Sequence, residues 1–208
     1  MNPKELKANS ESIIKGFGLE VNPALPLIEH LEQLKLRKAS DIARRILVLG
    51  YLYGISFKVK RSKIKEDLKR YGLYNDLSPQ EKKVLNSLFL SKQARTDVDW
   101  LTEGIEVLGW AIGLWDEFSP LEQCNEDRQA DVVALKQDPS DFINNTRLIE
   151  VEKILQQADL IYRLHWVAKR AKVGRLGEYS NDIYTERHKA INWVIGIEEC
   201  WDEIRTDT

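Results

Sequence analysis

Two histidines and two glutamates are the side chains best suited to chemistry: His165, His188, Glu103 and Glu186. If the fold brought them together, they could bind a divalent metal or carry out acid–base catalysis. The spacing gives this hypothesis little support. The chain has no HExxH sequence, and Glu186 and His188 would diverge by about 200° on one helix.

The same residues also fit a buried polar network that orients helices. Glu103 lies in an apolar stripe of a helix expected over 100–115, and a buried carboxylate needs a cation or hydrogen-bond donors. Arginines of the last two helices could supply the cation. Asp159 and Arg163 are four residues apart, as are His188 and Asn192, so each pair could bond along a helix. Both interpretations draw on one candidate set: Glu103, Arg163, His165, Trp166, Glu186, Arg187, His188, Asn192 and Asp202. The sequence favours the network over a ligand or catalytic pocket, and it assigns no metal ligand and no cofactor.

Helices must position these residues, because no run of the chain alternates between apolar and polar residues as a strand would. One helix is expected over 36–53, with Ser40 as its N-cap and Gly54 at its end. The sequence SPQE at 78–81 is a typical helix start, and this helix is expected to continue through Phe89.

Further helices are expected in the second half of the chain. The sequence TDVD at 96–99 predicts a cap for the helix over 100–115. Two more helices are predicted over about 147–173 and 182–204, with a turn at 174–182 between them.

These elements predict an all-α fold, a single compact helical domain of roughly seven to nine helices. All six tryptophans lie between residues 100 and 201, which predicts a Trp-rich C-terminal core. Residues 1–35 are expected to form an N-terminal arm, and residues 36–208 the helical domain.

Composition limits the function classes. A net charge of -2 and 43% hydrophobic residues are ordinary for a globular protein. The start of the chain lacks a signal peptide, and no apolar run reaches membrane-spanning length. The two cysteines, Cys124 and Cys200, are expected to be free thiols in the cytoplasm. No Walker loop, GxGxxG or GxSxG sequence is present.

Charge is distributed unevenly along the chain. Residues 35–72 hold twelve lysines and arginines against three acids, whereas residues 97–160 hold fifteen acids against four bases. A basic surface is therefore predicted at Lys58, Lys60, Arg61, Lys63, Lys65, Lys69 and Arg70. Aromatic residues are interleaved with these bases, as on a nucleic-acid surface. An acidic partner protein or plain solvation would account for the charge equally well.

Several sequence motifs are similar to those of a known family. RKASDIARRILVL, LSPQEKKVL, WLTEGIEVLGWAIGLWDE, ADLIYRLHWVAKRA, ERHKAINWV and WDEIRTDT together resemble the mostly bacterial family catalogued as domain of unknown function 4272, over about residue 36 to the end. The resemblance implies one helical unit and no established activity. It draws attention to Arg163, Trp166, Glu186, Arg187, His188, Asn192, Trp193, Trp201, Asp202 and Asp207.

Three function hypotheses follow. The first is a non-enzymatic cytoplasmic protein that binds a protein partner, as an adaptor, inhibitor or immunity-type protein. The second is an enzyme or small-ligand binder with a polar pocket at Glu103, Arg163, His165, Glu186 and His188. The third is nucleic-acid binding through the basic stretch Lys58–Arg70. No membrane partner is expected.

Overall fold

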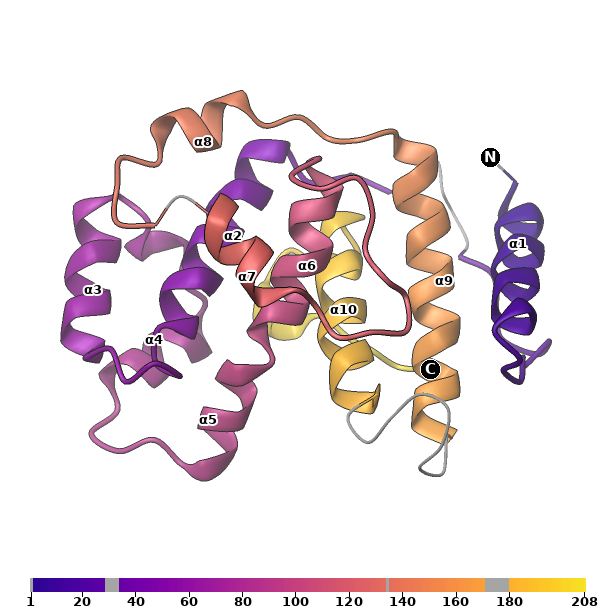
Figure 1. Cartoon of the computed structure of the whole chain (residues 1–208), viewed down its shortest axis with the longest axis horizontal. Helices are drawn as coiled ribbons and strands as arrows, with labels where there is room; N and C mark the ends of the chain where they lie inside the picture. Colours follow the sequence, from indigo (N-terminus) through magenta and orange to yellow (C-terminus); the bar gives the residue numbers. More distant parts are fainter. Residues whose placement is uncertain (1, 29–33, 134, 171–179) are drawn as a thin grey trace.

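Helices make up all the regular structure in residues 2–28, 34–133, 135–170 and 180–208, the parts of the chain that this computed structural model describes (Figure 1). The predicted all-α fold is thereby confirmed. No helix in these parts is both long and apolar enough to cross a bilayer.

The long helices lie side by side across the molecule (Figure 1). At the centre, α6 (Leu101–Ala111) packs between α2 (Ala39–Tyr53) and α10 (Ser180–Val194). Next to α10 comes α9 (Val151–Arg170), and α1 (Pro3–Gly16) covers the far side of α9. Almost every residue of α6 is buried, as its apolar sequence on most sides predicts.

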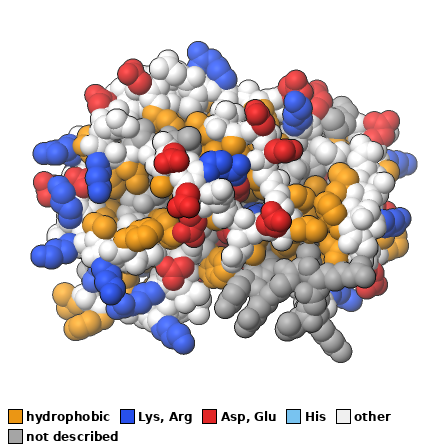
Figure 2. All heavy atoms as spheres, viewed as in Figure 1, with side chains coloured by type: hydrophobic (Ala, Val, Ile, Leu, Met, Phe, Trp, Pro, Cys, Tyr) orange, Lys and Arg blue, Asp and Glu red, His pale blue; other side chains and the backbone are white. Residues whose placement is uncertain are grey.

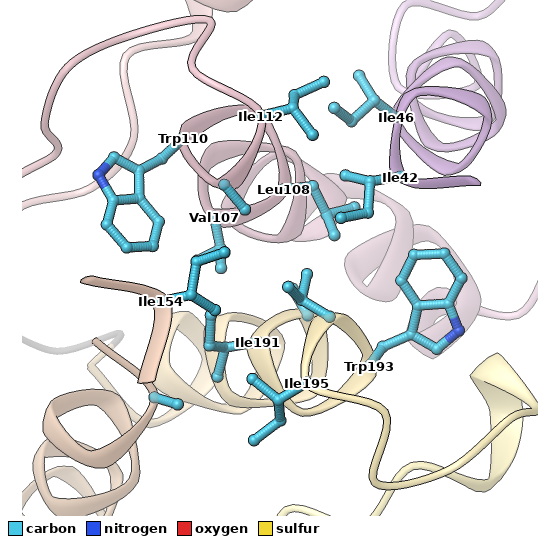
Figure 3. Packing of buried hydrophobic residues seen from close by; sticks show 14 of the residues in the cluster. Ile42, Ile46, Val107, Leu108, Trp110, Ile112, Ile154, Ile191, Trp193 and Ile195 are labelled. Carbon is cyan, nitrogen blue, oxygen red and sulfur yellow. The ribbon is translucent and has the colours of Figure 1, made fainter. Parts of the chain in front are cut away.

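The main core lies where α2, α6, α9 and α10 meet. Figure 3 shows Ile42 of α2 directed toward Leu108 of α6 and Ile46 directed toward Ile112, while Ile154 of α9 lies beside Ile191 of α10. The predicted Trp-rich core is present, and it includes Trp110, Trp115, Trp193 and Trp201. The indoles of Trp193 and Trp201 meet edge to face, with ring centroids 5.6 Å apart.

Shorter helices complete the fold. Three of them form the end of the molecule beside α2 (Figure 1), and two connect α6 to α9. They are α3 (Arg61–Arg70), α4 (Pro79–Asn86), α5 (Lys92–Asp99), α7 (Glu126–Val132) and α8 (Ser140–Asn145), together with the single 3-10 turns η2 (Tyr74–Asp76) and η3 (Trp201–Glu203).

The start of α4 is as predicted. The Ser78 hydroxyl accepts from the Glu81 amide, and the Glu81 carboxylate accepts from the Ser78 amide at 2.7 Å. The predicted end of α2 at Gly54 is also confirmed. Ser40 as N-cap of α2 is wrong: the N-cap is Lys38, which makes no side-chain cap bond. Just before this end, the Arg37 amide donates to the Val194 carbonyl at 2.9 Å, a contact between distant segments that no local signal indicates.

The helix predicted over 100–115 is shorter than expected. It ends at Ala111, and Trp115 folds back so that its indole covers Gly109, where a Cβ would lie 2.2 Å from the ring. The indole N–H donates to the Glu106 carbonyl at 3.1 Å. The predicted cap at 96–99 is wrong too, because these residues form the end of α5.

The last long helix also ends earlier than the predicted residue 204. After α10 the backbone turns at Gly196, which has a φ of 78°. A Cβ at Gly196 would lie 2.2 Å from the Lys35 carbonyl oxygen, so only glycine fits this turn. The Arg37 guanidinium donates to the carbonyls of Trp193 and Glu198, which ties the turn to the start of α2. Most of the turn predicted at 174–182 lies outside the described residues.

Part of the segment expected as an N-terminal arm is the helix α1. Its residues Leu6 and Ile14 are fully buried, and α1 packs against α9. Gln156 of α9 donates to the Ser10 hydroxyl at 2.9 Å. This helix therefore belongs to the packed part of the molecule.

Candidate functional site

His165 of α9 and His188 of α10 form a buried pair. Their Nδ1 atoms are 3.0 Å apart, and the two side chains are 0% and 3% exposed. The Thr185 hydroxyl donates to the Asn181 carbonyl at 2.7 Å and lies 3.2 Å from His165 Nε2. Because that hydroxyl has only one hydrogen, His165 Nε2 is the donor to Thr185. His165 Nδ1 then accepts, and His188 Nδ1 donates to it.

Both imidazoles of this pair are neutral near pH 7. Burial is the main cause that lowers the pKa of His165 to about 4 and that of His188 to about 3; the Lys169 ammonium contributes to both shifts, and His165 contributes to that of His188. Neutral imidazoles could bind a metal. However, no group of three or more ligand side chains lies together anywhere in the described part of the chain. The prediction of a hydrogen bond between His188 and Asn192 is wrong: the Asn192 side chain donates to the Arg205 carbonyl instead.

Glu103 is paired with Arg187, as predicted from the need of a buried carboxylate for a cation. Arg187 Nε donates to Glu103 Oε2 at 2.8 Å, and both residues are at most 1% exposed. The other Glu103 oxygen accepts from the Cys124 amide at 3.0 Å. Arg187 also donates to the carbonyls of Ser119 and Glu122. This ion pair thus joins α6 and α10 to the segment after α6, and its hydrogen-bonding capacity is largely used.

A second arginine has a similar role in α9. Arg163 makes two hydrogen bonds with the Asp159 carboxylate, at 2.8 and 2.9 Å, which confirms the predicted pair. It also donates to the Pro26 carbonyl at 3.1 Å. The Arg170 guanidinium covers the Trp166 ring at 4.8 Å. These contacts connect α9 to the segment that follows α1.

Glu186 lies apart from these groups. It lines a hollow of about 320 Å³ together with Trp201 and Asp202. Its Oε2 atom is buried without a hydrogen-bond partner among the described residues, and burial raises the pKa of its carboxyl. The Asp202 carboxylate accepts from the Gln80 amide at the start of α4. The structure therefore brings the two histidines together but places Glu103 and Glu186 in separate surroundings.

Two more ion pairs were not foreseen from the sequence. Arg45 of α2 binds both carboxylate oxygens of Glu81, at 2.8 and 2.9 Å, and lies over the Trp201 ring. Arg128 of α7 pairs with the buried Glu106. Each pair joins helices far apart in the sequence, so no local spacing could have indicated it.

The basic stretch is divided between two environments. Lys63 pairs with Asp67 at 3.0 Å, and Lys69 lies over the Tyr74 ring. Lys58, Lys60, Arg61 and Lys65 instead line a groove of about 720 Å³, which is bounded by residues 55, 56 and 58–62, Lys65, residues 85–90, Arg95 and Asp99. We call it the basic groove. Among the described residues that line it, Asp99 is the only acid.

Leu88 and Phe89 at the edge of the basic groove are both 88% exposed. The sequence predicted them inside a helix, which is wrong because α4 ends at Asn86. Arg61 donates to the carbonyls of Val84 and Leu88, both at 3.0 Å, and so holds the α4–α5 connection in place. Figure 2 shows hydrophobic side chains beside Lys and Arg side chains at this end of the molecule.

Cys124 is unsuited to nucleophilic chemistry. Its thiol is not in a disulfide. Burial and the Glu103 charge raise the pKa of the thiol to about 12, so the reactive thiolate is scarce at neutral pH.

These features define a helical protein whose interior arginines are paired with acids and whose exposed apolar residues adjoin a basic groove. The chain belongs to the family described as Domain of unknown function (DUF4272), whose model matches residues 6–204. The match begins well before residue 36, where the resemblance of the motifs was expected to start. No curated protein and no solved structure matches the chain.

Proposed function

We propose that this protein binds a partner protein through the basic groove and the adjoining Leu88 and Phe89. The observation that carries the proposal is the 88% exposure of both side chains next to each other. Large apolar side chains that lie together on a solvent-exposed surface are typical of interaction sites. Aromatic and aliphatic anchors of this kind supply much of the binding energy at protein interfaces.

The charge of the basic groove favours a partner segment that carries acidic residues. Lys58, Lys60, Lys65 and Arg95 line it, and Asp99 accepts from the Ser56 hydroxyl. A segment that carries Asp or Glu around a large apolar residue would complement both the bases and the two exposed side chains. Complementary charge also speeds encounter between the two surfaces.

Nucleic acid is the alternative occupant, and the contacts favour protein over it. The Arg61 guanidinium is engaged with main-chain carbonyls, and Lys63 is paired with Asp67. Two bases of the predicted stretch are thus already in use, which reduces the phosphate contacts that it could make. Of the two exposed side chains only Phe89 offers a ring for base stacking, and Leu88 does not.

The test is a selection of random displayed peptides on the immobilised protein. Enriched peptides are synthesised and titrated by fluorescence anisotropy against the parent and a Leu88→Ser/Phe89→Ser variant. We expect acidic peptides with an apolar anchor, whose Kd rises by about tenfold or more in the variant. A matched variant at two other exposed residues, Val151→Ser/Ile197→Ser, should leave the Kd unchanged.

A charge-reversal pair tests the second half of the proposal. Lys58→Glu/Arg95→Glu should weaken the same peptides, and Lys4→Glu/Lys15→Glu on α1 should not. Peptides that bind equally well to both Leu88→Ser/Phe89→Ser and the parent would overturn the proposal. Tighter binding of a mixed-sequence oligonucleotide than of any selected peptide, lost in Lys58→Glu/Arg95→Glu, would assign the groove to nucleic acid instead.

A further inference from the structure

A second cavity lies on the other side of the segment that follows α2. It has a volume of about 570 Å³ and is enclosed by α2, α3, α6, α7 and the residues after α7. Its wall is mostly apolar and aromatic, with Tyr51, Tyr53, Phe57, Ile64, Ile105 and Leu135 among its members. We call it the aromatic cavity. Volume and lining are those of sites that hold drug-sized molecules.

The backbone of α2 approaches this cavity closely because position 50 is glycine. A Cβ at Gly50 would lie 3.4 Å from the Leu135 side chain and 3.5 Å from Val133. These two residues follow α7 and form part of the cavity wall. In Figure 2, hydrophobic side chains reach the surface between the places that α3 and α7 occupy in Figure 1. The aromatic cavity is therefore open to solvent on this face.

One buried polar group in the wall lacks a partner. Gln129 of α7 is 4% exposed, and its Nε2 donates to the Thr102 carbonyl at 3.0 Å and to Glu106 Oε2 at 2.8 Å. The Thr102 carbonyl can only accept, so the amide cannot be turned around. Its Oε1 is then a buried acceptor, and none of the described residues donates to it. Such an acceptor is costly unless a donor reaches it.

The remaining polar groups restrict the charge of a ligand. The Tyr53 hydroxyl donates to the Glu126 carboxylate at 2.6 Å, and the Tyr51 hydroxyl accepts from the Lys136 amide at 2.9 Å. Asp67, Glu126 and Asp127 line the cavity against the single base Lys136. An anion would meet this acidic excess, whereas an uncharged or cationic molecule would not.

We infer that the aromatic cavity binds a small aromatic molecule, uncharged or cationic, whose N–H or O–H donates to Gln129 Oε1. This inference is independent of the proposed partner binding. The two sites share Val59 as a wall residue but are lined by different polar groups.

Three dyes with one skeleton test the inference on the intact protein. N-phenyl-1-naphthylamine is uncharged and carries one N–H donor. Its N-methyl derivative lacks the donor, and 1-anilinonaphthalene-8-sulfonate adds a negative charge. Fluorescence titration should give saturable binding of the first dye. Binding of the N-methyl derivative should be weaker by about tenfold, since one buried hydrogen bond is lost. The sulfonate should also bind more weakly.

Variants then locate the bound dye. Ala130 is an exposed residue of α7 at the edge of the cavity, so Ala130→Trp should block it without disturbing the core. The matched control is Ala8→Trp at an exposed position of α1. The first dye should lose most of its affinity for Ala130→Trp and keep it for Ala8→Trp and for Leu88→Ser/Phe89→Ser.

Three results would overturn the inference: no saturable binding of the uncharged dye, equal affinity for the dye and its N-methyl derivative, or affinity lost in Leu88→Ser/Phe89→Ser but kept in Ala130→Trp. The dye comparison on the parent protein needs no variant, so it decides the donor requirement even if a substitution fails to fold. A failed peptide selection at the basic groove would leave all of these dye results unaffected.

Discussion

The buried histidine pair should make the protein sensitive to mild acid. His165 and His188 have ordinary pKa values when the chain is unfolded, whereas in the folded state burial lowers their pKa values to about 4 and about 3. Between those values and about 6.5 the unfolded chain therefore binds more protons than the folded chain. The stability from the neutral pair is complete above pH 6.5 and is lost as the pH falls toward 4.

The size of this loss follows from the two shifts. A histidine that is neutral when folded and protonated when unfolded costs about 1.4 kcal/mol of unfolding free energy per pH unit. Two such histidines remove about 4 kcal/mol between pH 7.5 and pH 5. This is a large part of the 5–15 kcal/mol, roughly, that stabilises an ordinary domain.

The assay is urea unfolding followed by tryptophan fluorescence from pH 7.5 to pH 5 at constant ionic strength, on the parent and on His165→Leu/His188→Leu. Removing both imidazoles leaves no unpaired partner, and Thr185 keeps its bond to Asn181. Buried carboxylates with raised pKa values act in the opposite sense but occur in both proteins, so they cancel in the difference. As the pH falls from 7.5 to 5, the unfolding free energy of the variant should rise by about 4 kcal/mol relative to that of the parent. A constant difference would refute the assignment of a neutral pair.

Three further outcomes are expected. Glu103→Ala should lower the unfolding free energy by about 3–5 kcal/mol in urea titrations, because the buried Arg187 loses its counter-charge; a loss below about 1 kcal/mol would contradict a buried ion pair. Gly196→Ala should destabilise the protein far more than Gly72→Ala, since both have positive φ but only Gly196 has a carbonyl in the way; equal shifts of Tm would contradict the close approach. Cys124 should react with iodoacetamide at pH 8 much more slowly in the native than in the unfolded protein, because its thiol pKa is raised to about 12; mass spectrometry of the alkylated peptide decides this.

Features that depend on neighbouring residues were predictable from the sequence. The Ser78–Glu81 capping box needs only four residues in the right order, and the structure contains it. The Asp159–Arg163 pair follows from helical spacing alone. The partner of Glu103 could be predicted as an arginine of a late helix because a buried carboxylate needs one, and Arg187 fulfils that requirement.

Features set by packing between distant segments were not predictable. The helix over 100–115 ends at Ala111, shortly before Gly113, which has a φ of 71°. Glycine at this place is a local stop signal, but the local sequence does not show that Trp115 folds onto Gly109. His188 meets His165 instead of Asn192 because α9 and α10 pack with those faces together. Phe89 lies beyond the end of its expected helix, next to Leu88, whose carbonyl accepts a hydrogen bond from the distant Arg61. Spacing within one helix cannot show which face of another will cover it.

The arginines that donate to main-chain carbonyls also affect how the protein unfolds. Arg37, Arg163 and Arg187 each donate to carbonyls of connecting segments that are distant from them in the sequence. Detaching such a segment would leave some N–H groups of a guanidinium without acceptors, inside the protein in the cases of Arg163 and Arg187. These connections should therefore resist limited proteolysis for as long as the helices stay packed, and open together with them in one cooperative transition.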